Sequence, residues 1–371
     1  ICLSCKQSDE LFVEKENLSK EYTLDENGYV KNSEFSILDF TSSETCKDCH
    51  LEHYNEWSES MHAYSTKDPK FFSGMQHARS KYPETGERFC VQCHNPIAFL
   101  IGEDFSNFSS SNDFLNSDLP QQIKDGIGCD VCHSMTALSE TVHAEDNILA
   151  NAVYHLFPEK NVKYGSIKEP KENSFHESVY NPIYSQSEAC LPCHDFTIRG
   201  IEAEITFTEW NRIPGLAMSG ALSCQDCHMQ TKPDGTHDHR FTGVDVDLTY
   251  AIGESPLHFE VEKMLKSATT LEFGYYNHYL PDSISKNDQL NIPITITSRT
   301  AHSFPSGTSF AREAWVKVII ENNNNEILYQ SGNYKREQSL DYNEENLLFF
   351  TTFFLDELGD TLDSVIDLKE Y

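Results

Sequence analysis

The stretch Cys46-Lys-Asp-Cys-His-Leu-Glu-His-Tyr-Asn-Glu-Trp-Ser-Glu-Ser-Met-His62 is the one around which the rest of the chain is organised. Its first five residues place two cysteines three positions apart and a histidine directly after the second cysteine. Two thiols at this spacing can form thioether bonds with the two vinyl groups of one haem, and the adjacent histidine can bind the iron. The stretch therefore predicts covalent attachment of a c-type haem.

The same Cys-x-x-Cys-His pattern occurs five times in the chain. Zinc sites would require the cysteine pairs to be matched in twos, and five pairs leave one unmatched. Neither zinc sites nor disulfides require a histidine after every second cysteine, so five haems are expected. The haem-attaching residues would be Cys46, Cys49, Cys90, Cys93, Cys129, Cys132, Cys190, Cys193, Cys224 and Cys227, and the proximal iron ligands would be His50, His94, His133, His194 and His228.

The first residues, Ile-Cys-Leu-Ser-Cys-Lys, leave three interpretations open. They resemble the end of a bacterial lipoprotein signal with a lipid anchor on Cys5, which is the interpretation that we favour. A sixth haem at Cys2 and Cys5, with Lys6 in place of the histidine, is a second interpretation. A disulfide between the two cysteines is the third.

The composition points to an exported, acidic protein. The chain has 371 residues and a formal net charge of −31, which disfavours binding to nucleic acid or to anionic lipid and suits a basic or neutral partner. Haem attachment through cysteine requires assembly outside the reducing cytosol. We therefore expect the periplasm or the outer-membrane surface of a Gram-negative-type bacterium. No apolar run approaches the length of a transmembrane helix.

Changes in composition and residue pattern along the sequence predict three parts. Residues 1–44 are polar and predict a tether, with one short hairpin at Asn27-Gly28. Residues 45–245 hold all five motifs and predict a mainly α and irregular domain of short helices and long loops. Residues 246–371 contain alternating and β-branched runs with turn signals, which predict a mainly β, sandwich-like domain, and a truncation at its end is left open.

Eleven histidines remain after the five motifs are counted, enough to give every iron a second histidine ligand. Two histidine ligands make a haem low-spin and suited to electron transfer, whereas substrate chemistry requires an open sixth position. The abundance of histidine therefore favours electron transfer over catalysis.

The segment Cys-x-x-Cys-His-x-x-x-Tyr-x-x-Trp-x-x-Ser-x-His-Ala at 46–63 resembles the first haem segment of the cytochrome c-554 family, whose relatives include hydroxylamine oxidoreductase and tetrathionate reductase. The resemblance continues through Asp-Gly-Ile-Gly-Cys-Asp-Val-Cys-His at 125–133, through Cys-Gln-Asp-Cys-His-Met at 224–229 and through Ala-His-Ser-Phe-Pro-Ser-Gly at 301–307. Relatives often have proline after this methionine, whereas Gln230 stands here. The resemblance implies a multihaem c-type cytochrome and gives candidates for the distal iron ligands: His62, His176 and His239 first, then His143 and His302.

His302 is the candidate with the widest consequence, because a ligand donated by the β-rich part would lock the two domains together. His62 presents a different problem. If residues 50–62 form one helix, the two histidines lie about 18 Å apart along its axis, too far to bind one iron. We therefore expect His62 to bind a haem other than the one at Cys46 and Cys49.

Two functions from different classes remain. The first is a carrier that moves electrons through five mostly bis-histidine haems between redox proteins such as a quinol oxidase and other cytochromes. The alternative is a reductase of nitrite, hydroxylamine or a sulfur oxyanion with one open or lysine-ligated haem. Assembly into an oligomer or a filament is a third possibility, on which the sequence is silent.

Overall fold

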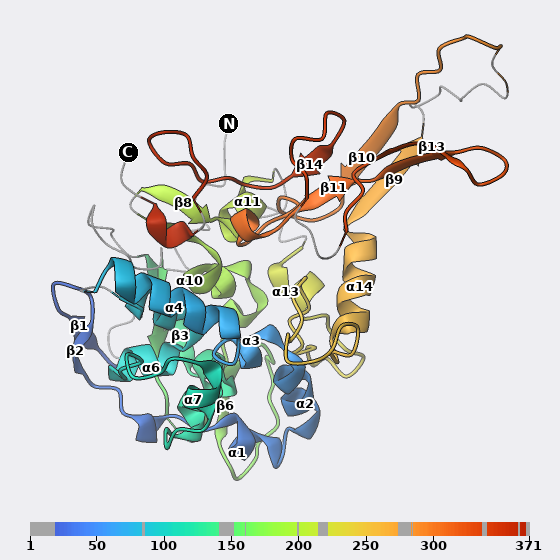
Figure 1. Cartoon of the computed structure of the whole chain (residues 1–371). Helices are drawn as coiled ribbons and strands as arrows, with labels where there is room; N and C mark the ends of the chain where they lie inside the picture. The colour runs from blue at the N-terminus through green and yellow to red at the C-terminus, as the bar shows by residue number, and fades with distance from the viewer. Residues whose placement is uncertain are drawn as a thin grey trace, which may run out of the picture.

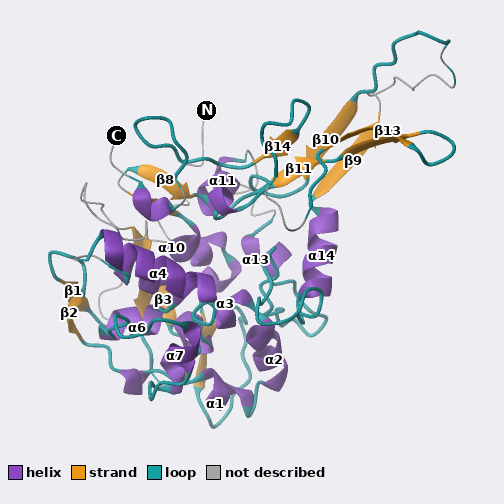
Figure 2. Cartoon of the chain, viewed as in Figure 1, coloured by secondary structure: helices purple, strands orange, loops and turns teal. Residues whose placement is uncertain are grey.

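The computed structural model describes residues 19–83, 86–140, 152–159, 161–198, 200–213, 222–273, 283, 285–335, 340–362 and 364–368. A body of short helices, small sheets and long loops is followed by a β-rich extension that projects from its upper side (Figures 1 and 2). This is the mixed helical and irregular texture that the motif spacing predicts.

Each haem motif forms about one helical turn. A helical turn brings residues three apart to the same face, so both cysteines of a motif point to one side while the histidine ends the turn. The cysteine-bearing turns are α1 (Ser43–Lys47), α5 (Arg88–His94), α9 (Cys129–His133), the 3₁₀ turn η3 (Ser187–Cys190) continued by α10 (Leu191–His194), and α13 (Cys224–His228).

The other helices are also short, and every helix that the structure describes falls short of the length and apolarity that crossing a lipid bilayer demands. Those used below are α2 (Leu51–Glu59), α3 (Met61–Tyr64), α4 (Pro69–Lys81), α6 (Pro96–Ile101), α7 (Ser111–Leu115), α8 (Gln121–Lys124), α11 (Thr206–Arg212) and α14 (His258–Ser267).

The chain from His50 to His62 is not one continuous helix. Helix α2 ends at Ser60, whose backbone is extended with a ψ of 159°, and the Ser60 hydroxyl caps α3 by accepting from the backbone N–H of Ala63. The assumption that residues 50–62 form one helix is therefore wrong, so the separation of His50 and His62 estimated from it does not apply. The position of His62 has to be taken from the structure itself.

Three two-stranded sheets lie within the motif-bearing part. Strands β3 (Met135–Glu140) and β4 (Ala152–Leu156) pair antiparallel, as do β7 (Phe196–Ile198) and β8 (Ile201–Glu204). Strands β5 (Val162–Gly165) and β6 (Glu177–Tyr180) pair in parallel. The first and third of these sheets, β3–β4 and β5–β6, lie in the long stretch between the third and fourth motifs, and β7–β8 follows the fourth motif.

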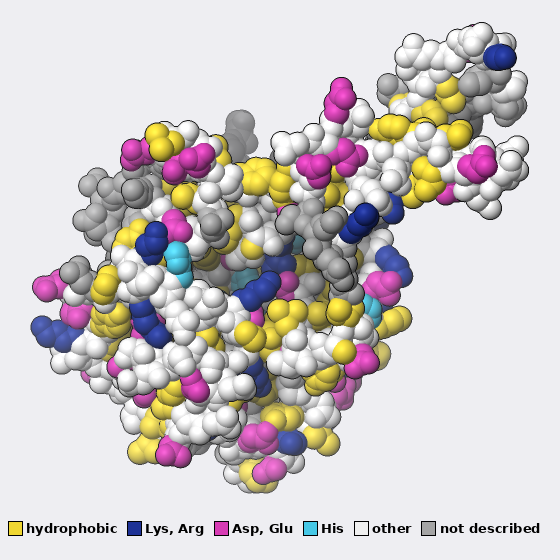
Figure 3. Space-filling model, in the orientation of Figure 1, with side chains coloured by type: hydrophobic (Ala, Val, Ile, Leu, Met, Phe, Trp, Pro, Cys, Tyr) yellow, Lys and Arg dark blue, Asp and Glu magenta, His cyan; other side chains and the backbone are white. Residues whose placement is uncertain are grey.

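The C-terminal part is β-rich, as expected. Its described strands form three separate antiparallel pairs, and the sandwich-like arrangement stays a prediction. Apolar side chains gather along the projecting strands (Figure 3). The pairs are β9 (Thr269–Phe273) with β10 (Ile294–Ser298), β11 (Ala314–Val316) with β14 (Leu348–Phe350), and β12 (Val318–Glu321) with β13 (Ile327–Ser331).

Residues 19–44 differ from the expected tether. The hairpin predicted at Asn27-Gly28 is present between β1 (Tyr22–Leu24) and β2 (Val30–Ser33), and Gly28 has the positive φ of 75° that such a turn favours. Phe35 and Phe40 behind it are buried in the core. A few apolar residues in a polar segment were enough to dock it. Residues 1–18, with Cys2, Cys5 and Lys6, lie outside the described residues.

The protein core of the motif-bearing part consists of two small clusters that α6 joins. One contains Phe35, Phe40, Ile97, Leu100, Val131, Met135, Leu138, Leu156 and Ile183. The other contains Phe71, Phe72, Met75, Val91, Ala98, Phe105, Phe114 and Ile123. Both clusters include residues adjacent to motif cysteines, so packing of the core also fixes the positions of the motifs.

The third motif is fastened to α2 and α3 through the backbone before it. The buried indole of Trp57 donates to the carbonyl of Ile127 at 2.8 Å. Gly126 has a φ of 69°, and a side chain there would come within 2.4 Å of Ser65 Oγ. The Gly-Ile-Gly sequence thus allows the backbone to approach α3.

We predict that Trp57→Phe lowers the free energy of unfolding by about 1–3 kcal/mol, because it leaves the Ile127 carbonyl buried without its donor. Guanidinium unfolding followed by far-ultraviolet circular dichroism measures the change. Phe175→Leu is the control, since Phe175 is 76% exposed and its replacement should alter stability by no more than about 0.5 kcal/mol. Equal stability of Trp57→Phe and the natural protein would contradict the assigned role.

Candidate haem sites

The motif cysteines fit thioether attachment. All ten are free thiols in the structure, and most are only half-exposed. Among the described residues, then, none of the motif cysteines forms a disulfide. Both cysteines of the second, third and fifth motifs lie in one helix, whereas Cys49 follows α1 and the fourth motif is divided between η3 and α10.

Cysteines of different motifs lie in contact with each other. The thiols of Cys46 and Cys129 interact, which joins the first and third motifs. The thiols of Cys93 and Cys193 join the second and fourth motifs in the same way. A third contact, between Cys190 and Cys224, joins the fourth and fifth motifs.

Tyr154 on β4 connects the third motif with the fourth. Its hydroxyl lies 3.2 Å from the Cys193 sulfur. Burial first, and then the neighbouring thiols of Cys193 and Cys132, raise the pKa of Tyr154 well above its ordinary value. The phenol therefore stays protonated as a hydrogen-bond donor, and the five motifs form one connected set.

Four of the five motif histidines face a second histidine from a distant segment. Their ring centres are 6.2–6.4 Å apart, with angles of 17–44° between the ring planes. The pairs are His50 with His176, His133 with His239, His194 with His62, and His228 with His302.

This separation fits a metal ion held between the rings. A metal–imidazole nitrogen bond is about 2.0–2.1 Å long and the ring centre lies roughly 1.1 Å farther, so two rings bound to one ion have centres about 6.3 Å apart. All four second histidines are among those that the family resemblance offers as distal candidates. The described residues thus fit a haem with two histidine ligands at four motifs.

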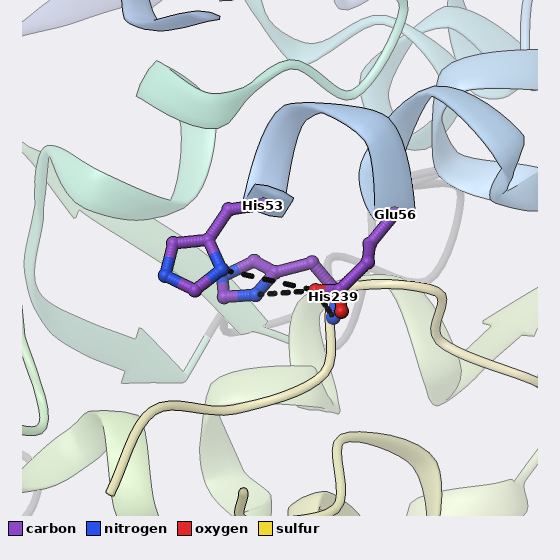
Figure 4. A group of neighbouring side chains, drawn as sticks. All are labelled: His53, Glu56 and His239. Atoms are coloured by element: carbon purple, nitrogen blue, oxygen red, sulfur yellow. Dashed lines mark hydrogen bonds and ion pairs between the residues drawn. The ribbon is translucent and has the colours of Figure 1, made fainter. Parts of the chain in front are cut away.

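His53 also lies 6.2 Å from His50, but it does not compete with His176. Residues three apart at a helix start have Cβ atoms about 5–6 Å apart and point the same way, so they cannot grip an ion from opposite sides. His53, Glu56 and His239 form a tight group (Figure 4). Since the His239 ring faces His133, this group lies at the third motif.

Two half-buried distal candidates, His62 and His239, have pKa values that keep them neutral, as iron ligation requires. Burial lowers the pKa of His62 to about 3. Burial, followed by the neighbouring rings of His133 and His53, lowers the pKa of His239 to about 3 as well. A neutral imidazole keeps a lone pair on one ring nitrogen, which is the form that binds a metal ion.

Hydrogen bonds at Nδ1 leave Nε2 available on most of these rings. Among the distal histidines, His239 donates to the carbonyl of His237 at 2.7 Å, His302 to that of Ser303 at 2.8 Å, and His176 to that of Glu177 at 3.2 Å. A carbonyl only accepts, so Nδ1 carries the proton. This arrangement orients a metal-binding histidine.

Three proximal histidines show the same pattern, and His194 differs from them. His133 and His228 each donate Nδ1–H to a backbone carbonyl at 2.7 Å, and His94 does so to the carbonyl of Ser65 at 3.2 Å. His194 instead meets the buried carboxylate of Glu204 at 3.3 Å. Glu204 lies on a β-strand that carried no motif signal, and sequence reasoning missed it.

His94 of the second motif differs from the others. Its ring stacks on Phe71 of α4 with centres 4.7 Å apart. Within the residues that the structure describes, no histidine ring opposes it at the separation seen for the other four. The remaining distal candidate, His143, lies outside the described residues.

Comparisons with known proteins point to cytochromes of the c type. Residues 45–134 match the family model described as cytochrome c554 and c-prime. Among solved structures, a penta-heme cytochrome c552 from Thermochromatium tepidum superposes with a TM-score of 0.61 at 20% identity, covering 88% of this chain and 82% of that one. No curated protein matches the chain.

The structural likeness establishes a shared fold, while the family match covers the first three motifs. Together with five attachment motifs and four opposed histidine pairs, they confirm the resemblance noted in the sequence. Residues 45–134 thus match the cytochrome c554 family, and the fold of the chain is similar to that of a multihaem c-type cytochrome.

Proposed function

We propose that this protein carries electrons through five covalently bound haems, at least four of which have two histidine ligands. The observation that carries the proposal is the set of opposed histidine pairs at 6.2–6.4 Å. Each bound haem supplies a one-electron carrier at its iron. The chain contributes the ligands, their orientation and the exclusion of water. The penta-heme title of the similar structure supports the number of haems.

The contacts between motifs support a continuous route. Thiol contacts join the first motif to the third and the fourth to both the second and the fifth. Tyr154 bridges the third and fourth. The protein would therefore serve as a branched conductor in which the motif at 190–194 is the junction.

Export to the periplasm or the outer-membrane surface follows from covalent haem attachment in this proposal. Acidic side chains are spread over the visible face rather than gathered in one patch (Figure 3), and the net charge is −31. Redox partners such as a quinol oxidase or another cytochrome would therefore dock through basic or neutral surfaces. A lipid anchor at Cys5, and assembly into oligomers or filaments, are parts of the proposal that rest on the sequence alone.

The domain organisation is part of the same proposal. Residues 45–245 would form the pentahaem unit, and residues 246–371 a sandwich-like unit. His302 opposite His228 would make the second unit a ligand donor to the first. The two units would then be joined by an iron–nitrogen bond as well as by the peptide chain.

One observation favours a second function. The second motif lacks an opposed histidine among the described residues, and His94 is instead packed on Phe71. An open iron position there would allow a reductase acting on nitrite, hydroxylamine or a sulfur oxyanion. The two functions differ at this single motif.

The oxidised protein decides between them by paramagnetic resonance and visible spectroscopy. We expect low-spin signals to dominate and to stay unchanged when nitrite or hydroxylamine is added, as for an electron carrier. A high-spin signal that changes with either compound would favour the reductase instead. Intact mass, measured in parallel, confirms how many haems the sample carries.

His62→Ala should convert the haem at Cys190 and Cys193 to high spin, because His62 faces His194 and the variant removes its distal ligand. Added imidazole should restore the low-spin spectrum. His258→Ala, on the first turn of α14, is the control and should leave the spectrum unchanged. If the haem at Cys46 and Cys49 changes instead, the assignment of His62 is wrong.

Glu204→Gln should raise the reduction potential of the haem at Cys190 and Cys193. The carboxylate at 3.3 Å from His194 Nδ1 makes the imidazole a stronger electron donor, which favours the oxidised iron. A redox titration followed by nuclear magnetic resonance resolves the individual haems. Glu202→Gln on the same strand, with an exposed carboxylate, is the matched control. Equal shifts in both variants would contradict a specific role for Glu204.

A further inference from the structure

Two Glu-Trp dipeptides occur on helices in different parts of the chain, Glu56-Trp57 on α2 and Glu209-Trp210 on α11. Both tryptophans are buried, and both donate their indole N–H to a backbone carbonyl. Trp57 donates to Ile127 at 2.8 Å and Trp210 to Leu222 at 3.0 Å. Each of these carbonyls lies two residues before the first cysteine of a haem motif.

The two glutamates bind backbone next to a distal histidine. Glu56 Oε2 accepts from the backbone N–H of His239 at 3.1 Å, and Figure 4 shows the two residues against each other. Glu209 Oε2 accepts from the backbone N–H of Ser303, which follows His302, at 3.1 Å, and from the hydroxyl of Ser306 at 2.6 Å. Each glutamate thus holds a loop that bears a distal histidine.

The two halves of each dipeptide serve the same haem site. Trp57 holds the backbone before the third motif, and the loop that Glu56 holds brings His239 opposite His133 of that motif. The same relation links Trp210, Glu209 and the fifth motif, where His302 faces His228.

The surroundings of these two motifs match as well. The backbone N–H of Cys129 donates to Ser43 Oγ at 3.2 Å, and that of Cys224 donates to Ser187 Oγ at 3.0 Å. Each serine lies three residues before the first cysteine of another motif. The cysteines that begin those motifs, Cys46 and Cys190, are the ones whose thiols contact Cys129 and Cys224.

We propose that each Glu-Trp dipeptide is a clamp that sets the distance between the proximal and distal ligands of one haem, and that the fold uses this clamp twice. Glu56 and Glu209 are positioning residues in this proposal, since they act through His239 and His302. The inference rests on the proposed assignment of these two histidines as iron ligands. It adds the chain's own means of holding them in place.

The two clamps differ in the groups that surround the glutamate carboxylate. Glu56 is 4% exposed, and its Oε1 contacts Lys232 Nζ at 2.5 Å, with Arg240 at 3.7 Å. Both of its oxygens therefore face donors. Glu209 Oε2 accepts both of its described hydrogen bonds, from Ser303 and Ser306. A glutamine could replace Glu209 with its amide oxygen in the same place, whereas it would turn an amide NH₂ toward a donor at position 56.

The test uses Glu56→Ala and Glu209→Ala in the fully haem-loaded protein, with carbon monoxide as the probe of the reduced irons. Carbon monoxide binds only after the distal histidine leaves, so a loosened loop should speed its binding at one haem by roughly 10- to 100-fold. Glu56→Ala should affect the haem at Cys129 and Cys132, and Glu209→Ala the haem at Cys224 and Cys227. Nuclear magnetic resonance contacts of the haem methyl groups assign the site.

Matched controls separate the clamp from general effects of lost charge. Glu52 lies on the same helix as Glu56 and also contacts Lys232, so Glu52→Ala removes a contact of Lys232 without touching His239. Glu202→Ala removes the exposed carboxylate that pairs with Arg212. Both should bind carbon monoxide at the natural rate. Glu209→Gln should behave like the natural protein, and Glu56→Gln should resemble Glu56→Ala.

Several results would overturn the proposal. They are equal rates in the alanine variants and the natural protein, acceleration at the same haem in both variants, and acceleration in the controls. If intact mass shows that an alanine variant has lost haem, the two glutamine variants test the proposal instead. Glu56→Gln and Glu209→Gln are expected to behave in opposite ways, and neither removes the whole side chain. If the natural protein lacks two-histidine signals at the third and fifth motifs, the ligand assignment itself fails. That outcome is distinct from a failed clamp on intact ligands.

Discussion

The opposition of two imidazole rings with their centres 6.2–6.4 Å apart is the constraint on which the rest of this fold depends. One ring of each pair is tied to a cysteine-bearing turn. In all four pairs the other ring comes from a segment at least 74 residues away along the chain, His228 and His302 being the nearest. Long loops and small two-stranded sheets bring these segments together. Because a small error in ring placement would prevent ligation, each loop is fastened by buried side chains such as Glu56 and Trp57.

The modest protein core follows from the same constraint. Two small apolar clusters support five motifs, and α6 contributes to both. Most apolar contact area around the motifs would be supplied by the porphyrins, since rings and thiols point toward one another rather than into a continuous side-chain core. We therefore expect folding and haem attachment to be coupled, because a prosthetic group would complete the interior.

The proximal histidines are not equivalent, and the difference lies beyond the motifs. Backbone carbonyls accept from His94, His133 and His228, whereas a buried carboxylate meets His194. A negative charge at this position increases electron donation to the iron. The motif at 190–194 also contacts the second and fifth motifs through its cysteines. The junction of the network is thus the site with a distinctive electrostatic environment, which would set the direction in which electrons divide.

The sequence by itself indicated the chemistry: Cys-x-x-Cys-His predicts a c-type haem and a histidine as its proximal ligand, because attachment needs thiols and imidazole at adjacent positions of one turn. It also indicated the family, the β-rich C-terminal part and the hairpin at Asn27-Gly28, all of which depend on neighbouring residues. Only the tertiary structure decided that His62 faces His194, that residues 19–44 dock on the core, and that Glu56, Glu204 and Glu209 serve the sites. Those relations join residues far apart in the chain, and the free energy that selects them comes from burial and hydrogen bonding across the whole fold, which no local pattern encodes.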